Sequence, residues 1–281
     1  MTAMHPTNPL IDEPGMSDPH ALVLNDTCYL FTGHDTGFGV SDWIMPDWRI
    51  YRSDDLQRWT HAGTISPADN YMGAGNTSCW AGDIVERNGR FYWYFSNGNR
   101  DCGVMVAESP EGPYRDVLGG PLVDSFDPTV FVDDDATPYL VYGMHQYKIA
   151  QLKENMIELA EEPRVIPFSR KGAFPSMDKN SLHKHGDIYY LGCSGHYATA
   201  DNPYGPYEYR GLVGTGWQLE SPYAHGDFFV WKGNWYHVWC RYRDRRVDRI
   251  RDCFIAPVRY LPDDRMEDDL SGLPRDQQGR C

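Results

Sequence analysis

This sequence has almost no helical periodicity and no membrane-spanning run, and its first residues lack the features expected of a leader peptide. The nearest approach to a helical pattern, Leu152–Glu162, is short and acidic, so an α-helical or α/β fold is disfavoured. No apolar run is long enough to cross a membrane, and Met1–Gly15 has neither the basic start nor the apolar stretch of a signal peptide. We expect a cytoplasmic protein without a membrane partner.

Positive charge is also scarce. Lys and Arg total 26 against 40 Asp and Glu, which gives a formal net charge of −14. The only basic cluster, Arg241 to Arg251, is interleaved with Asp244, Asp248 and Asp252. Because nucleic-acid binding needs clustered basic residues, a nucleic-acid partner is excluded and a neutral oligosaccharide fits this charge better.

Paired cysteines are absent as well. The seven cysteines are an odd number and include no C-x-x-C pair. Four of them, Cys28, Cys193, Cys240 and Cys253, lie in apolar or aromatic runs. We expect small buried thiols in a reducing compartment rather than a disulfide framework.

Short aromatic strands dominate what is present. Aromatic residues make up 14 % of the chain and hydrophobic residues 41 %, which is enough for a sizeable core. Five segments share one plan: a polar start, an apolar strand, a tight turn and an aromatic-rich strand. Their turns begin at residues 25, 88, 134, 185 and 232.

Hairpins repeated about every 50 residues are the signature of propeller blades. The sequence therefore predicts an all-β, five-bladed β-propeller with about four strands in each blade. We expect one domain over residues 1–281, with the propeller at about 16–261 and a polar tail at 262–281. No linker or composition break indicates a second domain.

Equivalent positions of successive blades form a ring around the axis of a propeller. The residues seven positions before each turn are Asp18, Ala81, Asp127, Asp178 and His225. Taken singly, Asp before Pro is often a turn residue, Asp178 beside Lys179 reads as a surface ion pair, and His225 as structural. Their shared register instead predicts three carboxylates and a histidine facing one another.

Such a cluster of carboxylates has an electrostatic cost unless it serves a function, because like charges in one pocket raise each other's pKa. Split pKa values are what acid–base hydrolysis requires. Inverting glycosidases place a carboxylate base and a carboxylic acid roughly 6.5–9.5 Å apart, so that a water molecule fits between them. The ring therefore predicts glycoside hydrolysis at the axis.

At these residues the sequence resembles glycoside hydrolase family 43, the five-bladed propellers that include xylosidases, arabinofuranosidases and arabinanases. The resemblance runs from about Ser17 to Leu261. It rests on the order and spacing of six motifs: Ser17-Asp-Pro-His20, Cys79-Trp-Ala-Gly-Asp83, Phe126-Asp-Pro-Thr-Val-Phe-Val-Asp-Asp134, Leu182-His-Lys184 with Ile188-Tyr-Tyr-Leu191, Tyr204-Gly-Pro-Tyr207, and His225-Gly226.

The resemblance implies roles for particular residues. Asp18 would be the general base, and Asp127 would tune the acid's pKa and orient the substrate. Substrate contacts would come from Trp80, Asp83, His225, Arg249 and Arg251. No cofactor is required, but a structural calcium ion bound through water is expected near His225, where carboxylates otherwise repel.

One position departs from the family pattern. The general acid is usually Glu, and the matching residue here is Asp178, which is shorter by roughly 1.5 Å. Three readings stay open: the pocket closes the gap, another carboxyl such as Glu220 supplies the proton, or the chemistry is lost or changed. Register favours Asp178 as the proton donor.

We therefore expect an inverting glycosidase, exo-acting on α-L-arabinofuranosides or β-D-xylosides of plant-type oligosaccharides. Loops at Thr36–Trp48 and Gly214–Tyr223 are expected to close its pocket. The non-enzyme alternative is a sugar-binding propeller with a disabled acid position. A retaining fructosidase or sucrase is disfavoured because no Glu-Cys pair occurs, and a sialidase because Ser53-Asp-Asp-Leu-Gln-Arg-Trp59 lacks the Gly of that motif and is not repeated.

Overall fold

All five predicted hairpins form, and the turns explain why. The first turn, Asn25–Asp26, has φ of 49° and 67°, and the second, Asn88–Gly89, has 54° and 75°. Two successive positive φ values are the geometry of the type I′ turn, which matches the twist of the flanking strands and favours Asn, Asp and Gly. The fourth turn lies at 186–187, one residue later than predicted.

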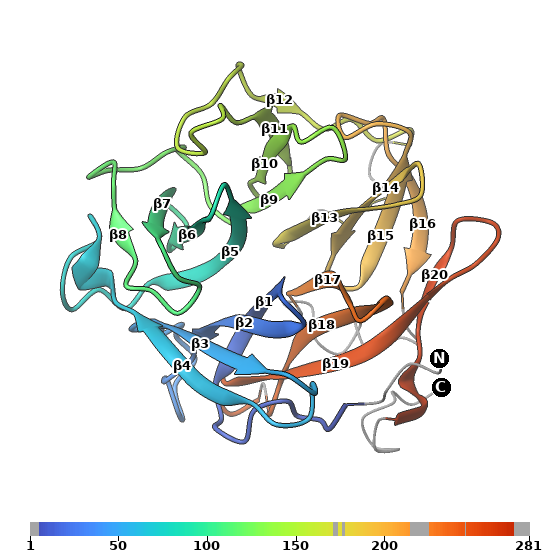
Figure 1. Ribbon diagram of the computed structural model, residues 1–281. Helices are drawn as coiled ribbons and strands as arrows, with labels where there is room; N and C mark the ends of the chain where they lie inside the picture. The colour runs from blue at the N-terminus through green and yellow to red at the C-terminus, as the bar shows by residue number, and fades with distance from the viewer. Residues whose placement is uncertain (1–5, 171–173, 176–177, 214–224, 245, 273–281) are drawn as a thin grey trace.

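The hairpins extend into five four-stranded antiparallel sheets, so the predicted five-bladed β-propeller is confirmed (Figure 1). The computed structural model describes residues 6–170, 174–175, 178–213, 225–244 and 246–272. Blade 1 holds β1 Met16–Leu24, β2 Thr27–His34, β3 Trp48–Ser53 and β4 Thr60–Ile65; blade 2 holds β5 Cys79–Arg87, β6 Arg90–Asn97, β7 Asp101–Ala107 and β8 Arg115–Asp116; blade 3 holds β9 Thr129–Val132, β10 Pro138–Tyr142, β11 Lys148–Gln151 and β12 Arg164–Val165. Blade 4 holds β13 Asn180–His185, β14 Ile188–Cys193, β15 His196–Ala200 and β16 Glu208–Leu212; blade 5 holds β17 Gly226–Trp231, β18 Asn234–Tyr242, β19 Arg251–Tyr260 and β20 Met266–Asp268. Short 3-10 helices lie at Pro67–Asp69 and Leu270–Gly272.

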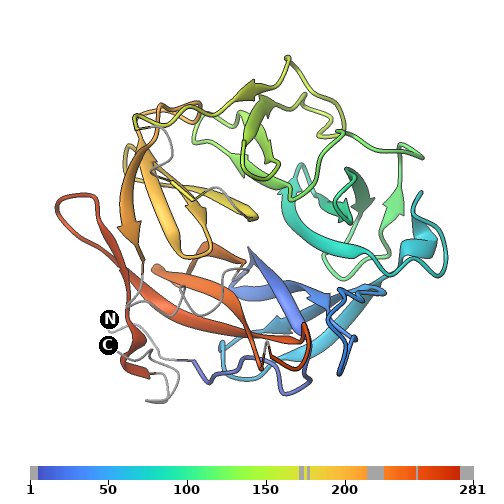
Figure 2. The same ribbon diagram turned by 180° about the vertical axis from the view of Figure 1, so that it is seen from behind.

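The innermost strands β1, β5, β9, β13 and β17 surround the centre of the ring, and the view from behind shows the same circular order (Figure 2). The first blade lies beside the last, where β1 packs against β17, β18 and β19. Residues before β1 complete this closure. Asn8 Nδ2 donates to Ile255 O at 2.9 Å, and Leu10 N donates to Cys253 O at 2.9 Å.

The hydrophobic core lies between neighbouring blades. Trp48 of blade 1 and Trp93 of blade 2 are both fully buried and pack edge to face, with ring centroids 5.9 Å apart. Comparable clusters join blades 2 and 3, 3 and 4, and 5 and 1. Since truncating a buried Trp to Ala typically costs about 3–5 kcal/mol, these seams fix how each inner strand faces the axis.

The structure also shows where the propeller ends, the state of the cysteines and the lack of a membrane-spanning helix among the described residues. Strand β20, Met266–Asp268, pairs with β19, so the propeller extends past the predicted boundary at 261. Six cysteines lie in the described part of the chain; all six are buried and none of them forms a disulfide. Among the described residues no helix is long and apolar enough to cross a membrane.

Candidate active site

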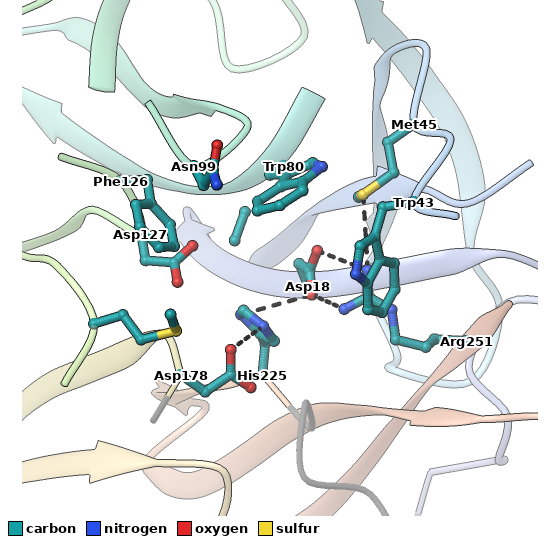
Figure 3. A pocket seen from close by; sticks show the side chains of 12 residues that line it. Asp18, Trp43, Met45, Trp80, Asn99, Phe126, Asp127, Asp178, His225 and Arg251 are labelled. Atoms are coloured by element: carbon teal, nitrogen blue, oxygen red, sulfur yellow. Dashed lines mark hydrogen bonds and ion pairs between the residues drawn. The ribbon is translucent and has the colours of Figure 1, made fainter. Parts of the chain in front are cut away.

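A cavity of about 320 Å³ opens at one end of the propeller axis. All five blades contribute to it, because each inner strand begins there (Figure 3). Its lining residues are Asp18, Trp43, Met45, Trp80, Ala81, Asn99, Phe126, Asp127, Met144, Asp178, His225 and Arg251. The five residues predicted from the hairpin register are all among them, so the register places three carboxylates and a histidine in one pocket.

Asp18 is held by a guanidinium. Arg251 Nη2 donates to Asp18 Oδ2 at 3.0 Å, and Arg251 Nη1 donates to Asp18 Oδ1. The same Nη2 donates to Asp35 Oδ1 at 3.0 Å, and all three side chains are buried. Burial alone would raise the pKa of Asp18, but Arg251, together with His225 and His20, outweighs burial and holds that pKa below its usual value. Asp18 is therefore an ionised, fixed carboxylate.

Asp178 is engaged at both oxygens. His225 Nε2 lies 2.8 Å from Asp178 Oδ1, and Ser194 Oγ donates to Asp178 Oδ2 at 3.1 Å. The other ring nitrogen of the histidine, Nδ1, lies 3.6 Å from Asp18 Oδ1. Burial lowers the pKa of His225, yet the carboxylates of Asp178 and Asp18 raise it to about 9. A protonated imidazole ring thus stands between the two outer carboxylates.

Asp127 has a different environment. Its side chain is 3 % exposed, and none of the described residues donates a hydrogen bond to its carboxylate. Burial raises the pKa of Asp127 to about 7; His225 opposes the rise and the Asp178 carboxylate adds to it. Asp127 therefore holds a proton at a pH at which an ordinary carboxyl group is ionised.

The backbone aims two of these carboxylates. Asp18 and Asp127 have φ of 47° and 60°, in the left-handed region, although both precede proline. Strained non-glycine backbone of this kind costs on the order of 1–3 kcal/mol and concentrates at functional sites. In β1 the strain coincides with a shift in register between Ser17 and His20, and the side chain of Asp18 points into the pocket (Figure 3).

Aromatic side chains form the walls. Trp80 and Phe126 meet edge to face, with ring centroids 6.3 Å apart. Trp43 lies on the opposite side of the pocket, over the Arg251 guanidinium (Figure 3). The guanidinium carbon of Arg251 lies 4.3 Å from the centroid of the Trp43 ring. The loop that carries Trp43 is fastened to blade 5, because Arg249 Nε donates to Ser41 O at 3.0 Å. Flat apolar walls with carboxylates at the base suit a sugar ring.

A profile of the glycosyl hydrolases family 43 matches residues 6–266. The chain belongs to this family. A xylosidase/arabinosidase of Bacteroides ovatus is 26 % identical over 79 % of this chain and 84 % of its own length. An arabinoxylan arabinofuranohydrolase of Paenibacillus polymyxa is 30 % identical over 83 % of this chain, which spans only 46 % of that relative.

Solved structures of family 43 share the architecture. An α-L-arabinofuranosidase from Clostridium thermocellum is 28 % identical, with a TM-score of 0.73 over 92 % of this chain and 95 % of its own. The GH43_1 enzyme from Xanthomonas citri complexed with xylose has a TM-score of 0.81 at 24 % identity, over 92 % of both chains. Together with the pocket carboxylates, membership of this family makes the chain a glycoside hydrolase.

Of the five predicted substrate-binding residues, three line the pocket and two do not. Trp80, His225 and Arg251 line the pocket, with Arg251 bound to Asp18. Asp83 and Arg249 do not line it. Asp83 is too deep, since it lies two residues inward along β5 and accepts Val130 N at 2.8 Å. Arg249 is outside, on the loop contact with Ser41.

Several residues of the site could not be identified from the repeated sequence pattern. Asp35 and Ser194 hold Arg251 and Asp178, but each reaches the site from a neighbouring strand end rather than from the repeated motif. Trp43 and Met45 come from the loop at 36–48, which was expected to close the pocket. The second expected loop, 214–223, and Glu220 within it lie outside the described residues.

The expected calcium ion needs ligands. Among the described residues no group of three or more His, Cys, Asp or Glu side chains could hold a metal ion. Both ring nitrogens of His225 face carboxylates, at 2.8 and 3.6 Å, and a protonated ring has no lone pair to give. The described residues therefore do not fit a directly ligated metal, and an ion held through water stays a prediction.

Proposed function

We propose that this chain is an inverting glycosidase that removes terminal α-L-arabinofuranosyl or β-D-xylosyl residues from plant-type oligosaccharides. The observation that carries the proposal is the division of the pocket carboxylates among three environments. Asp18 is bound by a guanidinium, Asp178 by an imidazolium and a hydroxyl, and Asp127 by none of the described residues. Different environments are how one site obtains a base and an acid at the same pH.

Asp18 is the proposed base. Its Arg251 contact keeps it ionised, and an ionised carboxylate can take a proton from water as that water attacks the anomeric carbon. One imidazole ring separates Asp18 from Asp178. That separation is in keeping with the roughly 6.5–9.5 Å that inversion requires, and not with direct attack by a carboxylate.

Asp178 is the proposed proton donor, by its position in the ring. Its Oδ1 lies 2.8 Å from His225 Nε2 and its Oδ2 accepts a hydrogen bond from Ser194 Oγ, so its carboxyl group is fixed in the pocket. Asp127, whose pKa is raised to about 7, interacts electrostatically with Asp178. We infer that the two carboxyls share one proton and that Asp178 hands it to the leaving oxygen.

The substrate class rests on the relatives and on the shape of the pocket. The relatives are named for xylosidase, arabinosidase and arabinofuranohydrolase activities. A cavity of about 320 Å³ is near the lower end of small-ligand sites, roughly 300–1,000 Å³, which supports binding of a chain end.

The test is a panel of nitrophenyl glycosides that includes the α-L-arabinofuranoside and the β-D-xyloside. The proposal predicts that wild type hydrolyses at least one of these two, and that Asp18→Asn lowers kcat/KM by about 10²–10⁴-fold while circular dichroism is unchanged. Binding of xylose or arabinose oligosaccharides without hydrolysis of any member of the panel would establish the alternative, a sugar-binding propeller.

A further inference from the structure

A second ring of polar side chains lies two residues inward from the pocket ring on every inner strand. Its members are His20, Asp83, Thr129, Asn180 and Asp227. Several of them connect neighbouring blades. Asp83 of blade 2 accepts Val130 N of blade 3 at 2.8 Å, and Asp227 of blade 5 accepts Ala21 N of blade 1 at 3.0 Å. The axis beneath the pocket is therefore polar and carries two further carboxylates.

Lys179 lies between the two rings. It follows Asp178 directly, yet it is only 2 % exposed, so the reading of Asp178 and Lys179 as a surface ion pair is wrong. Its Nζ donates to Thr129 Oγ1 at 2.8 Å and to Asn180 O at 3.0 Å. Among the described residues no carboxylate oxygen lies within 4.0 Å of Nζ, so the ammonium belongs to no single ion pair.

The electrostatic neighbours of Lys179 come from both rings. Burial lowers the pKa of Lys179, and the carboxylates that oppose this fall are Asp83, Asp127, Asp227 and Asp18. Two of these belong to the second ring and two to the pocket. Arg251 is bound to Asp18 and Asp35, and His225 to Asp178, so both are engaged in the pocket. Within the second ring, His20 Nδ1 lies 3.2 Å from Asp83 Oδ1 and 3.9 Å from Asp227 Oδ2 and shares these two carboxylates with Lys179.

A buried ammonium costs several kcal/mol unless charges nearby compensate it, and carboxylates gathered in one channel repel one another unless a cation lies among them. In a metal site a bound cation supplies that charge. Here the described residues include no group of three or more His, Cys, Asp or Glu side chains that could hold a metal ion, whereas the ammonium of Lys179 interacts electrostatically with four carboxylates. The position of Lys179 near these carboxylates therefore reduces both the cost of burying its ammonium group and the repulsion among the carboxylates.

We propose that Lys179 is the resident axial cation of this propeller, a positioning residue whose charge holds the pocket carboxylates and the second ring together and makes a bound metal ion unnecessary. The part of this proposal that concerns turnover rests on the proposed glycosidase activity; the part that concerns charge and stability does not.

The first experiment uses the wild-type protein and needs no substrate. Its melting temperature is measured after exhaustive chelation and again with added calcium chloride, and calcium binding is followed by titration calorimetry. The proposal predicts an unchanged melting temperature and no stoichiometric calcium binding. A calcium ion bound per chain, with a raised melting temperature, would overturn it.

The second experiment restores the missing charge. Lys179→Ala removes the atoms of propylammonium, whereas Lys179→Met removes the charge but fills the space. We expect both variants to melt lower than wild type and to lose about 10- to 100-fold in kcat. Propylammonium should raise the melting temperature and kcat of Lys179→Ala and leave Lys179→Met unchanged. Lys153→Ala, which removes the same charge from an exposed surface pair, is the control.

Two outcomes would overturn the proposal that the charge of Lys179 is what stabilises the site. One is rescue of Lys179→Ala by the neutral isostere 1-propanol as well as by propylammonium, which would leave only a space-filling role. The other is a Lys179→Met protein with wild-type melting temperature and kcat. If wild type hydrolyses no glycoside, the melting temperatures still decide the proposal, so its failure and that of the proposed function are distinguishable.

Discussion

Asp178 is the position at which the family resemblance implies a Glu, and the structure shows what surrounds this shorter side chain. His225 and Ser194 hold both of its oxygens, so Asp178 is fixed toward the pocket even though it lacks one carbon. Asp127 is the neighbouring carboxyl that retains a proton near neutral pH, because it is buried and its oxygens accept no hydrogen bond from the described residues. The division of labour between these two carboxyls is the open chemical question.

Leaving-group dependence separates the two carboxyls. A proton donor matters most when the leaving group is a sugar alkoxide and least when it is already acidic. Asp178→Ala should lose about 10²–10⁴-fold in kcat/KM on a disaccharide and much less on a nitrophenyl glycoside. Asp127→Ala should lower both substrates alike. The assignment is wrong if Asp127→Ala or Glu220→Ala shows the leaving-group dependence and Asp178→Ala does not.

The pKa of Asp127 has a consequence for stability against pH. Its usual value is 3.8 and burial raises it to about 7, so between these values the folded state binds more protons than the unfolded state. The contribution of Asp127 to stability is therefore present at low pH and lost as pH rises from about 4 to 7, by at most about 1.4 kcal/mol per unit. His225 acts with the same sign between pH 6.5 and 9.

Urea unfolding of wild type and Asp127→Asn at several pH values checks this sign. The variant should gain stability relative to wild type as pH rises from 4 to 7, since it lacks the titrating group. Parallel stability curves for the two proteins across that window would show that the pKa of Asp127 is not raised. The basic limb of the wild-type kcat/KM profile is expected near pH 7.

At the scale of strands and loops, the turns determined how much could be predicted. Seven residues separate each turn from the pocket ring, and β-strand periodicity carries that register along the strand, so Asp18 and His225 could be placed together from the sequence. The contact of Arg251 with Asp18 could not be predicted, because it spans 233 residues and forms only when β19 meets β1. Loops such as the one with Trp43 follow no repeat.

The loop contact gives an element-scale prediction. Arg249 fastens the loop of Trp43 by donating to Ser41 O and by lying 5.2 Å from the Trp43 ring centroid. Arg249→Met should raise KM by about 3- to 10-fold, since one hydrogen bond is worth about 0.5–1.5 kcal/mol, and should leave kcat unchanged. Arg246→Met, which breaks only an exposed ion pair with Asp244, is the control. A fall in kcat as large as that of Asp18→Asn would place Arg249 at the reacting atoms instead.

At the scale of the whole molecule, the ring must close for the pocket carboxylates to meet. Asn8 joins the start of the chain to the last blade through two hydrogen bonds: its Nδ2 donates to Ile255 O at 2.9 Å, and its Oδ1 accepts Ile255 N at 2.7 Å. No sequence pattern predicts this contact, because residues before β1 lie outside the repeat. Closure thus depends on a segment that the hairpin pattern does not describe.

Asn8→Ala tests this closure. Two lost hydrogen bonds should cost about 1–3 kcal/mol, which lowers Tm by about 2–4 °C for each kcal/mol in a chain of this size. Asn155→Ala, which loses only local bonds within one exposed turn, should stay close to wild type. Equal melting temperatures for all three proteins would mean that Asn8 contributes nothing to closing the ring.

The central claim is that Asp18 activates water across the pocket from Asp178, so that each hydrolysis inverts the anomeric carbon. Proton NMR of the first sugar released, recorded before mutarotation, tests this most directly. We expect the initial product to have the opposite anomeric configuration to the substrate. An initial product with the configuration of the substrate would require a covalent intermediate on one of these carboxylates, and Asp18 would then not act as a base on water.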